Sequence, residues 1–207
     1  MYLPPHFKAR DPAIALELVR SYPFASLVST DDDGFPFVTH LPLHAQEEGG
    51  ALVLWGHVAK PNPHWRYLQA RPQALATFLG PHAYLSPSVY PDTQRVPTWN
   101  YLAVHCKVEA RLVEDEAGKD SLLKRLIGDH EPAYAKQWLD LGPEFQHKML
   151  AGIVGFELRV LEIESKVKIN QHRPEAYEKQ HAGYAAGGEQ QRELARWMER
   201  LQAARST

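Results

Sequence analysis

Cysteine and long hydrophobic runs are the features that this sequence most clearly lacks. Cys106 is the single cysteine in 207 residues, which excludes a disulfide within the chain and a metal site built from several thiolates. No apolar stretch approaches the roughly 18 residues that a membrane-spanning helix needs. The first residues do not combine a basic segment with an apolar run, so we expect no signal peptide and predict a cytoplasmic location.

A dominant charge is also missing. The chain has 23 Lys and Arg against 25 Asp and Glu, which gives a formal net charge of -2. This balance predicts no basic surface for DNA or for anionic membranes. A hydrophobic content of 44% is ordinary for a globular protein, and the length predicts one domain.

The common catalytic and nucleotide-binding motifs are absent as well. No Gly-x-Gly-x-x-Gly or Walker motif is present, so nucleotide binding by those routes is not expected. His40 and His44 are four residues apart, but Pro42 lies between them, so they do not form a helical zinc motif. We therefore predict no metal site. Without a Gly-x-Ser-x-Gly elbow, we assign no catalytic residue.

The hydrophobic pattern predicts about six or seven strands with a few helices. The expected strands are 24–30, 35–43, 52–57, 73–79, 80–86, 102–113 and 153–163, and residues 98–101 are expected to lead into the sixth of them. The expected helices are 12–22, 63–70, 117–130 and 189–204, with shorter ones at 133–139 and 144–150. Residues 183–188 are expected to form a flexible approach to the last helix. Strands and helices do not alternate regularly, which favours a closed antiparallel barrel over a parallel sheet.

The stretch from Leu52 to Trp65 is the first candidate for a binding site. A short apolar strand is followed by a loop that contains His57 and Lys60, and Asn62 is the expected N-cap of the next helix. A small, cationic loop at a helix N-terminus is suited to hold a phosphate. The alternative is an ordinary connection with a solvated Lys60.

Two further groups of residues extend this candidate. Thr39 and His40 lie on a neighbouring strand, so they are expected to be presented together with His57 and Lys60. Residues 97–101 form an aromatic and amide cluster, which suits a flat heteroaromatic ligand. Packing in the core or in a dimer interface is the alternative for Trp99 and Tyr101.

Five segments, in order, resemble the PaiB family, which is described as FMN-binding negative transcriptional regulators. They are residues 1–7, 36–42, 56–65, 80–87 and 96–101, and the resemblance extends to about Arg173. It implies a mainly β, α+β fold, namely an FMN-binding split β-barrel with flanking helices, in a homodimer. Residues 1–173 would form the barrel domain and residues 174–207 a helical extension of it.

The resemblance also implies which residues contact FMN at the subunit interface. Thr39, His40, Leu41 and Pro42 would lie along the flavin and its ribityl chain. His57, Val58, Ala59, Lys60 and Asn62 would surround the phosphate, and Trp99, Asn100 and Tyr101 would come from the other subunit. The family has a Lys-Leu-Ser-Gln-Asn-like segment where residues 168–172 read Lys-Ile-Asn-Gln-His. Lys168 and Gln171 match and are counted among the expected FMN contacts, while Asn170 and His172 differ.

Three functions follow from these observations. The first is a PaiB-type negative regulator that binds FMN. The second is an FMN-dependent oxidoreductase, similar to a flavin reductase or a pyridoxamine phosphate oxidase, acting on a small substrate. The third is a haem-binding split barrel, because the chain has 11 histidines. No helix-turn-helix is evident and the last helix mixes both charges, which argues against direct DNA binding.

Overall fold

The computed structural model describes residues 1–9 and 11–203, which cluster into two compact units. Val19–Phe78 and His105–Ile163 form one unit, which we call the barrel unit. Met1–Leu18, Leu79–Val104 and the chain from Glu164 onward form the other, which we call the terminal unit. The unit boundaries fall within the first helix and within the three longest strands, and each unit is described separately below.

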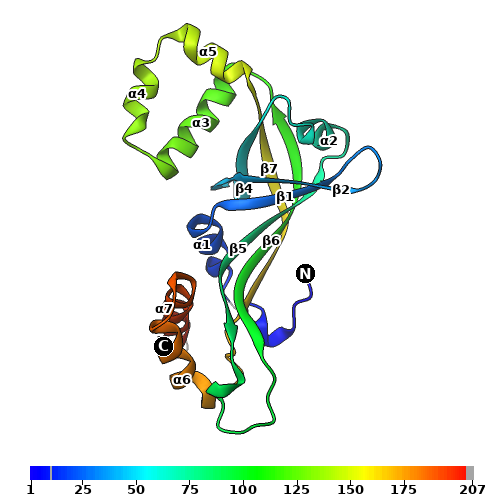
Figure 1. The fold of residues 1–207 in the computed structure, drawn as a ribbon. Helices are drawn as coiled ribbons and strands as arrows, with labels where there is room; N and C mark the ends of the chain where they lie inside the picture. Colours follow the sequence, from blue (N-terminus) through cyan, green and yellow to red (C-terminus); the bar gives the residue numbers. More distant parts are fainter. Residues whose placement is uncertain (10, 204–207) are drawn as a thin grey trace. The chain divides into compact units, whose positions relative to one another are not determined.

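A seven-stranded sheet forms the centre of the fold, with the strand order β2-β1-β5-β6-β7-β4-β3 (Figure 1). The strands are β1 (Phe24–Thr30), β2 (Pro36–Pro42), β3 (His44–Glu48), β4 (Ala51–Ala59), β5 (Gln73–Leu85), β6 (Thr98–Val113) and β7 (Ile153–Lys168). The pairs β1–β2, β1–β5, β3–β4 and β4–β7 are antiparallel.

The strand order shows why the barrel unit is curved. β2 and β3 lie at opposite ends of the order, yet only Leu43 separates them along the chain. The sheet must therefore curl until its two edges approach each other. No ladder joins β2 to β3 within the described ranges, so the barrel is split rather than continuously hydrogen-bonded. Leu41 and Leu43 reach across to Gly56 on β4.

The β1–β2 hairpin follows the sequence pattern closely. Ala25 and Leu27 on β1 are buried while the residues between them are less so, as expected for a strand with one face toward the core. The Asp31 carboxylate accepts hydrogen bonds from two backbone N–H groups of the turn, and Gly34 supplies the positive φ of 85°. Pro36 and Pro42 lie at the two ends of an edge strand, where a missing N–H costs little.

Seven α-helices lie within the described residues. They are α1 (Pro12–Ser21), α2 (His64–Ala70), α3 (Glu116–His130), α4 (Tyr134–Asp140), α5 (Pro143–Ala151), α6 (Tyr177–Ala185) and α7 (Glu189–Ala203). Helices α3 to α5 connect β6 to β7 in the barrel unit (Figure 1). In the terminal unit, α7 buries Leu194, Trp197 and Met198. None of the described helices is both long and apolar enough to cross a bilayer.

The structure contains two elements that were not predicted, and several predicted ones have other bounds: β4 runs to Ala59, β6 begins at Thr98 and β7 runs to Lys168. β3 was not predicted, because residues 44–48 are mostly polar. β5 is one continuous strand, although Gly80 and Pro81 suggested two. α6 includes Gly183 where a flexible approach was expected, and it buries Gln180 and Tyr184 rather than an aliphatic stripe. α2 begins one residue later than predicted, at His64, and the predicted last residue of α7, Ala204, lies outside the described residues.

Candidate functional site

In the barrel unit, Thr39 joins β2 to the segment that precedes α2. Its Oγ1 accepts a hydrogen bond from Asn62 Nδ2 at 3.2 Å and lies 2.8 Å from His64 Nδ1. His64 is fully buried, with the ring of Phe37 edge-on at 5.2 Å, and its Nε2 has no partner among the described residues. Burial lowers the pKa of His64 to about 4, so the imidazole is neutral at pH 7.

Most backbone N–H groups of the predicted phosphate loop are already engaged. Lys60 N donates to Gly152 O at 2.9 Å, Asn62 N to Ala59 O at 2.8 Å, and His64 N to Asn62 Oδ1 at 3.0 Å. Asn62 thus makes the expected capping bond, but α2 has only seven residues, so its N-terminus is a weak anion site. The cation that this loop offers to a phosphate is the exposed Lys60 ammonium.

His57 is the second notable side chain of the predicted phosphate loop. In the structure it lies on β4, which continues to Ala59, and its neighbours Gly56 and Val58 are buried. Its Nδ1 is buried without a described hydrogen-bond partner, and burial holds the pKa of its imidazole below the ordinary value. A neutral imidazole with an unsatisfied nitrogen is well suited to accept or donate a hydrogen bond to a ligand.

Strand alternation separates residues that we expected to act together. Successive side chains of a strand point to opposite faces. Thr39 and the buried Leu41 share one face of β2, whereas His40 is exposed on the other, 3.0 Å from Ser26 Oγ. The structure therefore brings Thr39, Asn62 and His64 together, and it does not place His40 in that cluster.

The remaining predicted contacts lie in the terminal unit. Trp99 is 53% exposed and lies near the rings of His82 and Tyr84. Asn100 is fully buried, where its Nδ2 donates to Tyr184 Oη at 3.1 Å and its Oδ1 has no described partner. The Tyr101 ring lies 5.3 Å from Lys166 Nζ and 5.9 Å from Lys168 Nζ.

The segment after β7 has a tightly bonded backbone. Gln171 Nε2 donates to the carbonyls of His6 and Val167, and its Oε1 accepts from Ile169 N. Gln171 therefore holds the chain in place with its whole amide. Asn170 adopts the left-handed region with a φ of 66°, which asparagine tolerates better than most residues. Lys168 Nζ, by contrast, has a single described hydrogen bond, to Thr98 Oγ1 at 2.6 Å.

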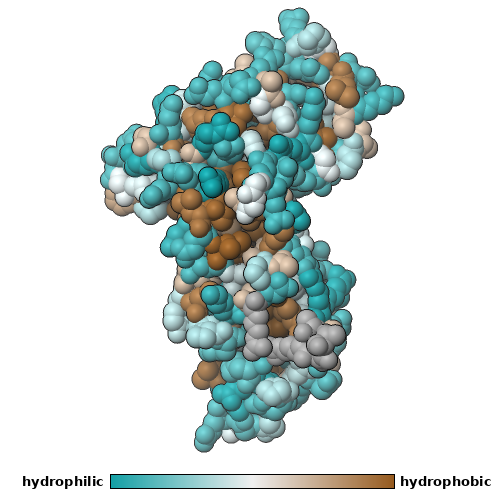
Figure 2. Space-filling model, turned by 180° about the vertical axis from the view of Figure 1, so that it is seen from behind, coloured by the Kyte–Doolittle hydropathy of each residue, from teal (hydrophilic) through white to brown (hydrophobic). Residues whose placement is uncertain are grey.

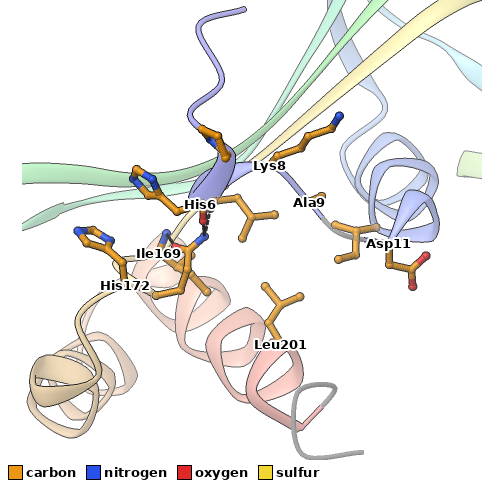
Figure 3. A pocket seen from close by; sticks show the side chains of 11 residues that line it. His6, Lys8, Ala9, Asp11, Ile169, His172 and Leu201 are labelled. Atoms are coloured by element: carbon orange, nitrogen blue, oxygen red, sulfur yellow. Dashed lines mark hydrogen bonds between the residues drawn. The ribbon is translucent and has the colours of Figure 1, made fainter.

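Two cavities of the terminal unit share His6 and His172 in their walls. One has a volume of about 700 Å³, and Figure 3 shows His6 and His172 on one side of it with Asp11 and Leu201 across from them. The other has a volume of about 410 Å³ and is lined by Lys168, Arg173 and Asn100 among others. The sequence pattern did not indicate His6, His64, Arg95 or Arg173 as site residues, because the cavity and the contacts to which they belong join segments that are far apart along the chain.

Comparisons with known proteins show the relationships of the chain. A family model described as "Putative FMN-binding domain" matches residues 1–162. The chain is 37% identical over 181 residues to the protease synthase and sporulation protein PAI 2 of Bacillus subtilis, and the match covers 84% of each chain.

Solved structures show the same fold at low sequence identity. The flavocytochrome Anf3 from Azotobacter vinelandii has a TM-score of 0.59 at 20% identity, covering 79% of this chain and 70% of that chain. The FAD and heme binding protein from Mycobacterium smegmatis has a TM-score of 0.56 at 17% identity, covering 78% and 73%. With the seven-stranded sheet, these similarities confirm the predicted α+β split barrel with flanking helices.

Proposed function

Because the chain belongs to the family of FMN-binding domains and FMN is its cofactor, we propose that it is a homodimeric negative transcriptional regulator of the PaiB type. The observation that carries this proposal is the 37% identity to PAI 2 along most of both chains. The barrel unit adds chemical support, because the Lys60 ammonium lies close in sequence to two imidazole nitrogens, of His57 and His64, that have no described hydrogen-bond partner.

The side chains of the barrel unit fit the chemistry of FMN. Lys60 is exposed and forms no ion pair with any described residue, so it is available to bind a phosphate. His57 Nδ1 and His64 Nε2 are buried nitrogens without described partners, and a polar ligand would satisfy them. In this proposal Lys60, with His57, Val58, Ala59 and Asn62, holds the phosphate. Thr39 and Leu41, which share one face of β2, line the flavin and its ribityl chain, whereas His40 and Pro42 lie on the other face and are left out of the site.

The partner subunit's Trp99 and Tyr101 would complete the flavin site, because aromatic rings suit the face of an isoalloxazine ring. Asn100 was expected to join them, but it is fully buried and its amide donates to Tyr184 of its own chain, so it is left out of the flavin site. Gln171 has no role in this arrangement, because its amide is engaged within its own chain. Lys168 is treated separately below, because it faces a cavity of the terminal unit.

An apolar sheet face in the barrel unit supports dimer formation. Phe24 and Val38 are 68% and 46% exposed and share one face of the β1–β2 hairpin. Leu161, also exposed, borders the same groove as Val28 and Leu75. Figure 2 shows hydrophobic side chains gathered on the face that it presents. Exposed apolar patches of this kind commonly mark protein interfaces.

The charge distribution argues that regulation does not use direct DNA binding. The net charge is -2, and α7 alternates Glu189, Glu193 and Glu199 with its arginines. Phosphate neutralisation needs clustered cations. We therefore propose that regulation acts through a protein partner or through the redox state of the flavin.

Two measurements test the regulator. Purified, FMN-loaded protein should show flavin absorption and should not shift DNA fragments selectively in a mobility assay. In cells, deletion of the gene and replacement by a Lys60→Ala variant should derepress the same transcripts. A selective DNA complex at physiological salt would contradict the indirect mechanism, and unchanged transcripts after deletion would contradict regulation itself.

An FMN-dependent oxidoreductase is the second candidate, and the cofactor itself favours it. Bound FMN supplies hydride or single-electron transfer, while the protein binds and orients the ring. The experiment is to measure NADH and NADPH oxidation by the loaded protein with quinone, nitroaromatic and free-flavin acceptors. Turnover by the unmodified protein that is lost in the Lys60→Ala variant would favour the enzyme. No turnover with any of these acceptors would leave the regulator as the single proposal.

A further inference from the structure

The smaller of the two cavities that share His6 and His172 has a positively charged lining. Lys168, Arg173, Arg95, His6 and His172 all contribute to its wall, and none of the described residues that line it is a carboxylate. We call it the cationic cavity. Its volume of about 410 Å³ lies in the range that small-molecule sites occupy.

The positive charges of this cavity are only partly balanced. Arg95 is paired with Asp92 at 2.8 Å and with Glu175 at 3.5 Å. Lys168 and Arg173 form no ion pair with any carboxylate in the described ranges; the hydrogen bond of Lys168 goes to the neutral hydroxyl of Thr98. Asp92 interacts electrostatically with Arg173, and Glu175 with His172, but neither carboxylate forms an ion pair with Lys168 or Arg173. The positive charge that faces the cavity is therefore only partly balanced and attracts an anion.

The pKa of the neighbouring His172 is affected by the same positive charges. Burial is the main reason why the pKa of His172 lies below its ordinary value, and the charges of His6, Arg173 and Lys168 lower it further. Glu175 acts in the opposite direction. His6 and His172 lie with their ring centroids 5.1 Å apart, so protonating both would add like charge. A bound anion would relieve this repulsion.

A buried acceptor in the wall gives the second, independent indication of a ligand. Asn100 lines the cavity and is fully buried, yet its Oδ1 has no described hydrogen-bond partner. Its Nδ2 is engaged by Tyr184. A buried oxygen without a hydrogen bond costs free energy. A ligand that donates a hydroxyl or N–H hydrogen bond to Asn100 Oδ1, after a small adjustment of the amide, would remove this cost.

We propose that the cationic cavity binds a small organic anion other than FMN, a carboxylate or a phosphate ester that also carries a hydroxyl or N–H group. Lys168 and Arg173 bind the anionic group, and Asn100 accepts the hydrogen bond. Phe7 and Tyr90 provide apolar wall for the body of the molecule. The site lies within the terminal unit and uses none of the loop residues that we assign to the FMN phosphate.

The test uses the full FMN-loaded protein and three probes, 4-hydroxybenzoate, 4-hydroxyphenyl phosphate and the neutral 4-hydroxybenzamide. Calorimetric titration should show binding of at least one anion, and the two anions distinguish a carboxylate from a phosphate ligand. The neutral amide should bind at least about tenfold more weakly, as expected when charge-assisted hydrogen bonds are lost. Equal binding of the amide, or no anion binding at millimolar concentration, would overturn the proposal.

Variants locate the site. Lys168→Gln and Arg173→Gln should each weaken the anion about fivefold or more, whereas Lys179→Gln, an exposed lysine of the terminal unit outside the cavity, should change it less than about twofold. If Lys168→Gln instead weakens FMN but not riboflavin, the cavity holds the flavin phosphate and the proposal fails. Independently of folding defects, the imidazole NMR signals of His6 and His172 in the unmodified protein should shift on anion addition; unmoved signals would contradict the site.

Discussion

At the scale of single residues, we predict that Lys60 is a main determinant of FMN affinity. The Lys60→Ala variant should bind FMN more weakly by roughly 1.5–3 kcal/mol, because a charge-assisted hydrogen bond to the phosphate is lost. Riboflavin, which lacks the phosphate, should bind equally to both proteins. Flavin fluorescence titration measures both affinities.

The matched control for this prediction is Lys136→Ala, an exposed lysine on α4 in the same unit. It should bind FMN as the unmodified protein does. If Lys60→Ala has normal FMN affinity, the ammonium is solvated and the phosphate lies elsewhere.

His64 should make the protein sensitive to mild acid. Burial lowers its pKa to about 4 in the folded chain, while the unfolded chain has the ordinary value near 6.5. The unfolded state therefore binds more protons between these values, so stability is complete above about pH 6.5 and falls as the pH approaches 4. The loss attributable to His64 should be about 2 kcal/mol, since the shift is large and the group is buried.

The measurement is urea unfolding at pH 7.5 and pH 4.5, at a fixed saturating FMN concentration. His64→Asn keeps an amide near Thr39 but does not titrate, so its loss between the two pH values should be smaller than that of the unmodified protein. His147→Asn, at an exposed position, should retain the full loss. Identical pH dependence of the His64→Asn and unmodified proteins would refute the assignment.

At the residue level, the sequence pattern selected residues that contact one another, but it did not show to which face of a strand each side chain points. Thr39 and Asn62 were both selected, and they are hydrogen-bonded across 23 positions. Thr39 and His40 were grouped together, although alternation along a strand sends them to opposite faces. The pairing of Thr39 with His64 could not be found, because no local pattern links a strand residue to a histidine in a later helix.

At the scale of elements, the close approach of Leu41 on β2 and of the following Leu43 to β4 depends on Gly56. A Cβ at this position would lie 2.6 Å from Leu43 Cδ2 and 3.2 Å from a ring carbon of Phe156. Gly56→Ala should therefore lower the free energy of unfolding by about 1–3 kcal/mol through overpacking. Thermal or urea unfolding of the two proteins measures the difference.

Gly128→Ala is the matched comparison and should act in the opposite direction. Gly128 lies in α3, and a Cβ there meets nothing within 4 Å. Alanine in a helix interior should stabilise by about 0.5–1 kcal/mol. A neutral Gly56→Ala variant would show that Leu43 moves aside freely, and the edges of the barrel would then be looser than the structure indicates.

Prediction of elements followed the strength of the hydrophobic pattern. β1 was predicted with the correct bounds, because its alternation is regular over the full length. β6 was predicted with the correct end, but it begins at Thr98 rather than at Leu102. β3 was missed because His44–Glu48 carries mostly polar side chains and gains its strand character by pairing with β4. α6 was missed because its buried residues include Gln180, whose amide bonds to Asn170 and Ile169 rather than to an apolar neighbour.

At the scale of the whole molecule, the sequence pattern indicated a barrel but not its strand order. Neighbours in the order, such as β1 and β5 or β4 and β7, are joined by contacts that span tens of residues. Periodicity within a strand carries no information about such partners. The resemblance to a known family supplied the split-barrel architecture, and the curvature then follows from the single residue between β2 and β3.

Homodimer formation is the prediction that belongs to this scale. Light scattering of the FMN-loaded protein should give about twice the mass of one chain at micromolar concentration. Val38→Glu places a carboxylate on the apolar face that Val38 shares with Phe24 and Val28, and a desolvated, unpaired charge is costly in an interface. The variant should shift toward monomer.

The same variant separates dimerisation from flavin binding. If the partner subunit's Trp99 and Tyr101 complete the site, Val38→Glu should weaken FMN binding as it dissociates the dimer, and raising the protein concentration should restore both. Leu139→Glu, an equally drastic change at a 66% exposed position on α4, should leave mass and affinity unchanged. A Val38→Glu protein that is monomeric yet binds FMN normally would show that one chain holds the cofactor alone, and an unmodified protein that is monomeric would rule out the shared site.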